Sequence, residues 1–186
     1  MSSAVKIETR AMGSCGSHPA IWFSASFALL ALGGWLTSIG LGDWYDTLDF
    51  PPYQPPGWAF TPAWVIILSL LAWSTWRISQ KFEDGFHSFL PLAYLLYGVQ
   101  FALNVGWSLL FFAVRRPDAA LWEILVLDAV LLAMVLVYGK IDRQAGWMLV
   151  PYLAWLLFAT AINAWISMHN GPFVLACPLG PIHLMS

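Results

Sequence analysis

The sequence predicts an all-α integral membrane protein, a single bundle of five transmembrane helices. Of the 186 residues, 60% are hydrophobic and only 10% are charged, whereas soluble domains carry about 25% charged residues. Five apolar stretches each reach the roughly 20 residues that a helix needs to cross about 30 Å of hydrocarbon. Lipid offers the backbone no hydrogen-bond partners, so a helix is the expected form of every stretch.

The predicted helices follow one another with short connections and form one membrane domain at 20–170. An N-terminal tail at 1–19 and a C-terminal tail at 171–186 flank this domain. Proline falls near three predicted helix starts, where its missing N–H costs little, at Pro62, Pro91 and Pro151. The first stretch is too long for the apolar region of a typical signal peptide, and no small-residue cleavage site follows closely. The five predicted spans are 20–41, 58–78, 88–113, 119–139 and 147–168.

The loops carry their basic residues asymmetrically. Six lie on the side of the N-terminus and two on the other side, which favours a cytoplasmic N-terminus in a bacterial inner membrane. The two cysteines, Cys15 and Cys177, lie in the tails, so their spacing predicts neither a disulfide framework nor a metal site. We expect them on opposite sides of the membrane. The net charge of −2 leaves no basic face for nucleic acid. The basic residues counted are Lys6, Arg10, Arg77, Lys81, Lys140 and Arg143 against Arg115 and Arg116.

The loop between the first two spans, 42–57, is the most distinctive segment. It reads GDWYDTLDFPPYQPPG, with three acids, four prolines and no basic residue. Proline pairs stiffen an extended chain. One interpretation is an ordinary solvated loop. The other is a semi-rigid lid, in which Trp44, Tyr45 and Trp58 cap a cavity at one end of the bundle.

Polar residues form a stripe along the third predicted helix. Gln100, Asn104 and Ser108 recur every four residues, and Trp107 lies beside them. Such residues can join helices through hydrogen bonds. They can also face a pocket, with the indole ring as a wall and the amide as a polar anchor. Both interpretations stay open, with Gln100 as a structural polar residue and Asn104 as the anchor.

A similar stripe follows the fifth predicted helix, where Trp155, Ala159 and Asn163 share a face. Here Asn163 is the expected structural contact between helices. The fourth span carries Glu123 near its start and Asp128 deeper inside. Intramembrane acids are expensive, and for Asp128 a hydrogen-bonded structural role and a proton-linked role both remain open.

Three segments together resemble the tryptophan-rich sensory protein and translocator protein family, also called TspO/MBR or peripheral benzodiazepine receptor. They are WYDTLDFPPYQPPGWAFTPAW at 44–64, QFALNVGWSLLFF at 100–112 and PYLAWLLFATAIN at 151–163. The resemblance implies five helices, in agreement with the count above. Two positions depart from the family pattern: Leu68 stands where a Tyr is usual, and Phe50 where a basic residue is usual.

The resemblance implies a membrane receptor or sensor for tetrapyrroles such as protoporphyrin, bound inside the bundle. It implies no required cofactor, because the porphyrin is the ligand, and it makes a homodimer plausible. A eukaryotic member would lie in the mitochondrial outer membrane. The four His residues are scattered over tails, a loop and a helix end, so we expect stacking to hold the ring and no metal to be ligated. The matching motifs carry over as ligand-binding candidates Trp44, Tyr45, Trp58, Asn104, Trp107, Trp155 and Ala159.

Other functions stay open at this point. The protein could be a transporter of porphyrins or sterols. It could be an enzyme that degrades porphyrins under light, with Trp58 and Trp155 as the reacting rings. It could also be a structural bundle that acts through partners. The sequence contains no Ser-His-Asp set, P-loop or dinucleotide fingerprint that would mark another activity.

Overall fold

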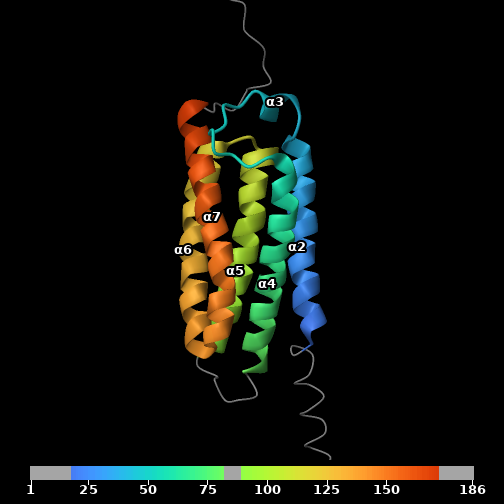
Figure 1. Cartoon of the computed structure of the whole chain (residues 1–186), viewed down its shortest axis with the longest axis vertical. Coiled ribbons are helices and arrows are strands. Elements are labelled where there is room, and N and C mark those ends of the chain that lie inside the picture. Colours follow the sequence, from blue (N-terminus) through green and yellow to red (C-terminus); the bar gives the residue numbers. More distant parts are fainter. Residues whose placement is uncertain (1–17, 82–88, 172–186) are drawn as a thin grey trace, which may run out of the picture.

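The computed structural model describes residues 18–81 and 89–171 and shows five long helices packed side by side (Figure 1). All five are long and apolar enough to cross a membrane, and the described residues contain no strand. The prediction of an all-α, five-span, multi-pass membrane protein is therefore confirmed. The helices are α2 (Pro19–Gly40), α4 (Phe60–Gln80), α5 (Leu90–Ser108), α6 (Pro117–Ile141) and α7 (Arg143–His169).

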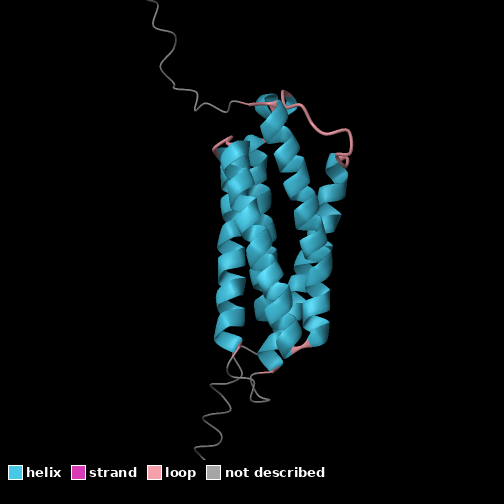
Figure 2. Ribbon diagram, turned by 90° about the vertical axis from the view of Figure 1, so that its left-hand side faces the viewer, coloured by secondary structure: helices cyan, strands magenta, loops and turns pink. Residues whose placement is uncertain are grey.

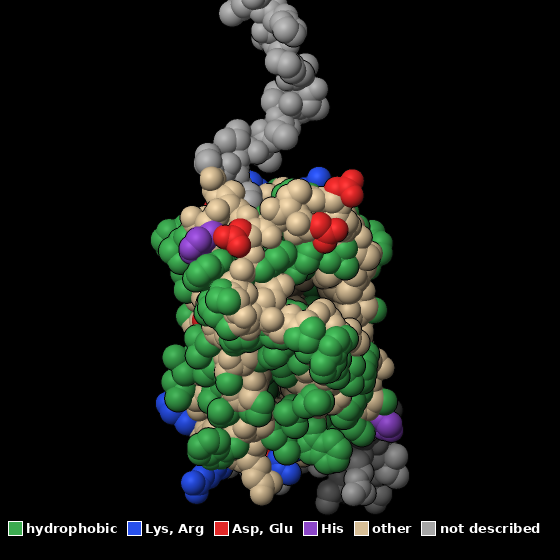
Figure 3. All heavy atoms as spheres, turned by 45° about the horizontal axis from the view of Figure 1, so that its top comes forward, with side chains coloured by type: hydrophobic (Ala, Val, Ile, Leu, Met, Phe, Trp, Pro, Cys, Tyr) green, Lys and Arg blue, Asp and Glu red, His purple; other side chains and the backbone are tan. Residues whose placement is uncertain are grey.

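Successive helices run in opposite directions, as short connections require (Figures 1 and 2). The segment 42–57, which we call the lid, joins α2 to α4 across one end of the bundle. It contains the short helix α3 (Asp43–Asp46) and leads into a 3₁₀ turn at Gly57–Ala59. We call this end of the bundle the lid end. Hydrophobic side chains cover the sides of the bundle, and charged side chains gather at its two ends (Figure 3).

At the lid end, α5 continues as a π-helical segment, Leu109–Ala113. This segment brings Phe112 against α2 at Gly40. A Cβ atom placed on Gly40 would lie 2.5 Å from the backbone oxygen of Phe112. Glycine at this position therefore permits the close approach of α2 to the π-helical segment.

Helix α7 begins earlier than the sequence predicts, at Arg143 in place of 147. Asp142 caps it, with its Oδ1 accepting hydrogen bonds from the backbone N–H groups of Gln144 at 2.9 Å and Ala145 at 3.5 Å. The expectation that Pro151 lies at a helix start is thus wrong, because Pro151 lies inside α7. Pro91 does lie in the first turn of α5.

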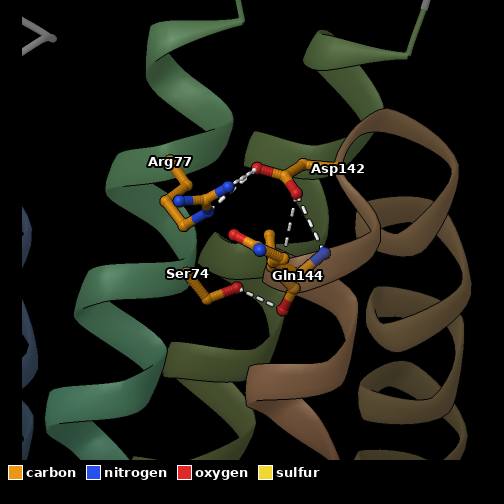
Figure 4. A network of polar contacts seen from close by, with 5 residues as sticks. Ser74, Arg77, Asp142 and Gln144 are labelled. Carbon is orange, nitrogen blue, oxygen red and sulfur yellow. Dashed lines mark hydrogen bonds and ion pairs between the residues drawn. The ribbon is translucent and has the colours of Figure 1, made fainter.

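The end of the bundle opposite the lid is fastened by a polar network around Asp142 (Figure 4). Its Oδ2 pairs with the Arg77 guanidinium of α4, at 2.7 Å from Nη2 and 2.9 Å from Nε. Nearby, the Ser74 hydroxyl donates to the backbone oxygen of Ala145 at 2.8 Å. One carboxylate therefore caps α7 with one oxygen and holds α4 with the other.

Replacing Asp142 by Ala should lower the free energy of unfolding by about 2 kcal/mol, since it removes both a helix cap and an ion pair. Asp142→Asn is the matched control, because asparagine caps helices about as well as aspartate and removes only the charge. Thermal unfolding in detergent should rank the proteins wild type, Asp142→Asn, Asp142→Ala. Equal losses for the two variants would show that the cap contributes nothing.

Candidate functional site

A cavity of about 430 Å³ lies in the half of the bundle next to the lid. All five long helices and the lid contribute to its walls. This volume lies within the range of about 300–1,000 Å³ that is typical of small-molecule sites. The lining consists mainly of aromatic and aliphatic side chains, among them Leu30, Tyr45, Phe60, Trp64, Leu68, Trp107, Phe112, Leu127, Trp155 and Ala159.

The aromatic walls of the cavity hold one another through edge contacts. The rings of Phe60 on α4 and Trp155 on α7 lie 5.7 Å apart at 75°. Trp107 on α5 contacts Phe112 in the same way, at 5.9 Å and 89°. Such contacts fix ring orientation, so the cavity presents a preformed set of flat apolar surfaces from three helices.

Tyr152, below the cavity, organises the polar stripe of α5. Its hydroxyl accepts hydrogen bonds from Gln100 Nε2 at 2.7 Å and from Asn104 Nδ2 at 2.8 Å. Tyr152 and Gln100 are fully buried, whereas Asn104 lines the cavity. The pair of bonds therefore holds Asn104 in place as a polar group in an otherwise apolar wall.

A second polar chain supports the Trp107 wall. The Trp107 indole N–H donates to Asn163 Oδ1 at 3.0 Å, and Asn163 Nδ2 donates to the backbone oxygen of Pro117 at 2.8 Å. Asn163 is buried and joins α5, α6 and α7. Asn163 therefore sets the orientation of the Trp107 ring. That ring lines the cavity, whereas Asn163 itself does not.

The lid forms the roof of the cavity through Tyr45 and Gln54, which both line it. Gln54 Nε2 donates to the Tyr45 hydroxyl at 3.3 Å. Burial raises the pKa of Tyr45, partly offset by this hydrogen bond and reinforced by Asp46, so its hydroxyl stays neutral at physiological pH. Leu48, beside them, is buried against Phe112 and its neighbours and seats the lid on the bundle.

Two glycines of α2, Gly33 and Gly34, belong to the cavity lining. A Cβ on Gly34 would meet no atom within 4 Å, and one on Gly33 would lie 3.7 Å from the Ser108 hydroxyl. These two positions therefore add no side chain to the α2 wall.

The sequence matches a known protein family over most of its length. The sequence profile of the TspO/MBR family matches residues 22–169. The chain belongs to the TspO/MBR family. Its relatives include the tryptophan-rich protein TspO of Archaeoglobus fulgidus, 34% identical over 150 residues, covering 77% of this chain and 92% of that protein. The translocator protein of Bos taurus is 33% identical over 149 residues, covering 78% and 86%. The tryptophan-rich sensory protein of Cereibacter sphaeroides is 32% identical over 121 residues, covering 65% and 73%.

The structure brings together five of the seven ligand-binding candidates taken from the TspO/MBR motifs. Trp44 and Trp58 lie elsewhere. Trp58 lies in the 3₁₀ turn at Gly57–Ala59 and is 77% exposed. Trp44 packs edge-on against Phe111 at 6.3 Å and lies under the Arg115 guanidinium. Neither ring is part of the cavity lining, and the candidates around the cavity are Tyr45, Asn104, Trp107, Trp155 and Ala159.

Several residues that line the cavity were not predicted from the sequence. Phe60, Trp64 and Leu68 follow one another every four residues on α4, a spacing that could have shown their shared face. Gln54 and Gly34 carried no such signal, because a loop glutamine and a helix glycine are common in any membrane protein.

The two acidic residues of α6, Asp128 and Glu123, lie outside the cavity lining. Asp128 Oδ2 accepts a hydrogen bond from the Thr160 hydroxyl at 2.9 Å, which joins α6 to α7. Glu123 faces α5 at Gly106, and neither of its carboxyl oxygens has a hydrogen-bond partner among the described residues. His18 and His169 lie at helix ends. Cys15, Cys177, His87 and His183 fall outside the described residues.

Proposed function

We propose that this TspO/MBR protein is a membrane receptor or sensor that binds a tetrapyrrole or a similar flat lipophilic molecule in the cavity under the lid. The observation that carries the proposal is the cavity itself. It is preformed, about 430 Å³ in volume, and lined by aromatic rings from four different parts of the chain. Relatives named as a sensory protein and as translocator proteins support a role in sensing or moving small molecules.

The chemistry of the lining suits a planar apolar ring. Indole and phenyl rings offer stacking and edge contacts, and Gly33 and Gly34 add no side chain to the α2 wall of the cavity. The Asn104 and Gln54 amides supply a small number of polar contacts, which in such sites fix orientation. Packing and stacking therefore hold the ligand, and none of the described His residues lines the cavity.

Binding is favoured over passage through the protein by the contents of the other half of the bundle. There the space between the helices is filled by fully buried side chains, including Leu71, Tyr138 and Leu149. The Thr75 and Tyr138 hydroxyls contact each other there at 3.3 Å. A carrier would have to open this packed half, whereas a receptor uses the cavity as it is.

The topology belongs to the same proposal. With the N-terminus in the cytoplasm of a bacterium, the lid faces the outside. A membrane-impermeant thiol reagent applied to intact cells should then label Cys177 and spare Cys15. Labelling of Cys15 in intact cells would reverse the orientation.

Titration of the purified protein with protoporphyrin tests the ligand class. Replacing Trp155, a cavity wall, by Ala should weaken binding about tenfold, the loss expected for one stacked aromatic contact. Replacing Trp122, which is on α6 and 74% exposed, by Ala is the matched control and should leave affinity unchanged. Binding is followed by the absorbance of the porphyrin, since removing Trp alters protein fluorescence directly. Equal affinities for the two variants would place the porphyrin outside this cavity.

A further inference from the structure

The lid is joined to the end of α7 by the side chain of Asn170. The Asp49 backbone N–H donates a hydrogen bond to Asn170 Oδ1, and Asn170 Nδ2 donates to the Asp49 backbone oxygen at 2.9 Å. One amide therefore satisfies both backbone groups of a single lid residue. The same Nδ2 also donates to the Ile166 backbone oxygen at 3.0 Å, which fixes the amide on its own helix.

Tyr53 makes a second contact between the lid and α7. Its hydroxyl donates to the backbone oxygen of Ala161 at 3.4 Å. Its ring lies 6.3 Å from that of Phe158 and 6.2 Å from that of Trp165. Gln54, the next residue, lines the cavity. The contact of Tyr53 with α7 therefore lies directly beside a lid residue that forms the roof of the cavity.

The opposite end of the lid begins at Gly42, a glycine in an unusual backbone conformation. Gly42 has a φ of 124°, a conformation that glycine adopts without strain and other residues avoid. The lid is thus attached to α2 through a permissive residue and to α7 through directional hydrogen bonds. The Asp49 contacts are exposed to solvent, so the freed groups can bond water when the lid opens.

We propose that Asn170 is a positioning residue that holds the lid closed over the cavity, and that breaking its paired hydrogen bonds with Asp49 admits and releases the ligand. The inference rests on the proposed function only in taking this cavity as the binding site. Asn170 does not line the cavity. It acts through the lid residues that line the cavity.

Access to the cavity can be measured without any ligand. Ser108 lines the cavity and is 6% exposed, so Ser108→Cys, in a protein with Cys15 and Cys177 replaced by Ser, places one thiol behind the lid. A small methanethiosulfonate reagent should label this thiol about tenfold faster when Asn170 is replaced by Ala, the change expected from losing hydrogen bonds of ordinary strength. Unchanged labelling would overturn the proposal.

We call the paired hydrogen bonds between Asn170 and Asp49 the latch. Two further variants distinguish the loss of the latch from a general loss of stability. Asn170→Asp keeps an acceptor for the Asp49 N–H but loses both donated bonds, so its labelling rate should lie between wild type and Asn170→Ala. Ser38→Ala removes a hydroxyl that donates only within α2, to Trp35, and should label like wild type. Hydrogen exchange should rise in the lid peptide of Asn170→Ala and stay unchanged in α5. Exchange that rises equally in both would indicate general unfolding and contradict the proposal.

Protoporphyrin kinetics then connect the latch to the ligand. Association and dissociation should both accelerate in Asn170→Ala, with a nearly unchanged Kd, because the cavity contacts are intact. If the wild type fails to bind protoporphyrin while thiol labelling still responds to Asn170, the proposed ligand is wrong and the latch stands. If protoporphyrin binds and neither labelling nor kinetics responds, the latch is wrong and the proposed function stands.

Discussion

Replacing Gly34 by Leu should reduce protoporphyrin affinity by about a hundredfold or more while the protein still folds. The reason is that Gly34 lines the cavity and a Cβ added there would meet no atom within 4 Å. A leucine at this position therefore has room to form and would reduce the space at the α2 wall. The measurement is the absorbance titration used for Trp155, together with thermal unfolding to confirm that the bundle is intact.

The control for this experiment is Gly98→Leu. Gly98 lies on α5, is exposed and also has no atom within 4 Å of an added Cβ, but it does not line the cavity. It therefore introduces the same side chain into a membrane helix without filling the site. Wild-type affinity in Gly34→Leu would show that the ligand does not use the α2 wall.

The second large effect is expected on stability, from Tyr152→Phe. The substitution keeps the ring and removes the hydroxyl that Gln100 and Asn104 both contact. Two buried amides then lose a partner, so we expect a loss of about 2 kcal/mol in the free energy of unfolding. Affinity should also fall, since Asn104 is no longer held in the cavity wall.

Tyr97→Phe serves as the comparison. Tyr97 is also buried on a membrane helix, but its hydroxyl has only a 3.5 Å contact with Ser26. Removing it should cost clearly less than removing the Tyr152 hydroxyl. Unfolding temperatures that fall by the same amount in both variants would show that the paired amides do not depend on Tyr152.

The sequence predicts the helices well because each span must satisfy a simple requirement, about 20 apolar residues in a row. It also predicts the polar framework. Asn104 and Asn163 stand out in apolar helices, and the structure gives both of them specific partners. A polar group in the membrane interior is energetically costly unless it has a partner or a function, so its position is informative.

Which aromatic rings face the cavity is harder to predict, because an apolar ring is stable both in the bundle and against lipid. Trp58 and Trp64 belong to the same motif, yet Trp58 is exposed and Trp64 lines the cavity. Trp58 lies in the 3₁₀ turn that precedes α4, whereas Trp64 lies within α4, so the exposure of each ring depends on how the helix is rotated relative to the loop. Nothing in the residue types at these positions encodes that rotation.

The cavity occupies only the half of the bundle that carries the lid, and this placement makes the protein asymmetric toward the two leaflets. Under the proposed function, a guest seated there would lie within one monolayer, and the occupancy of the cavity would reflect how much of the compound that single leaflet holds.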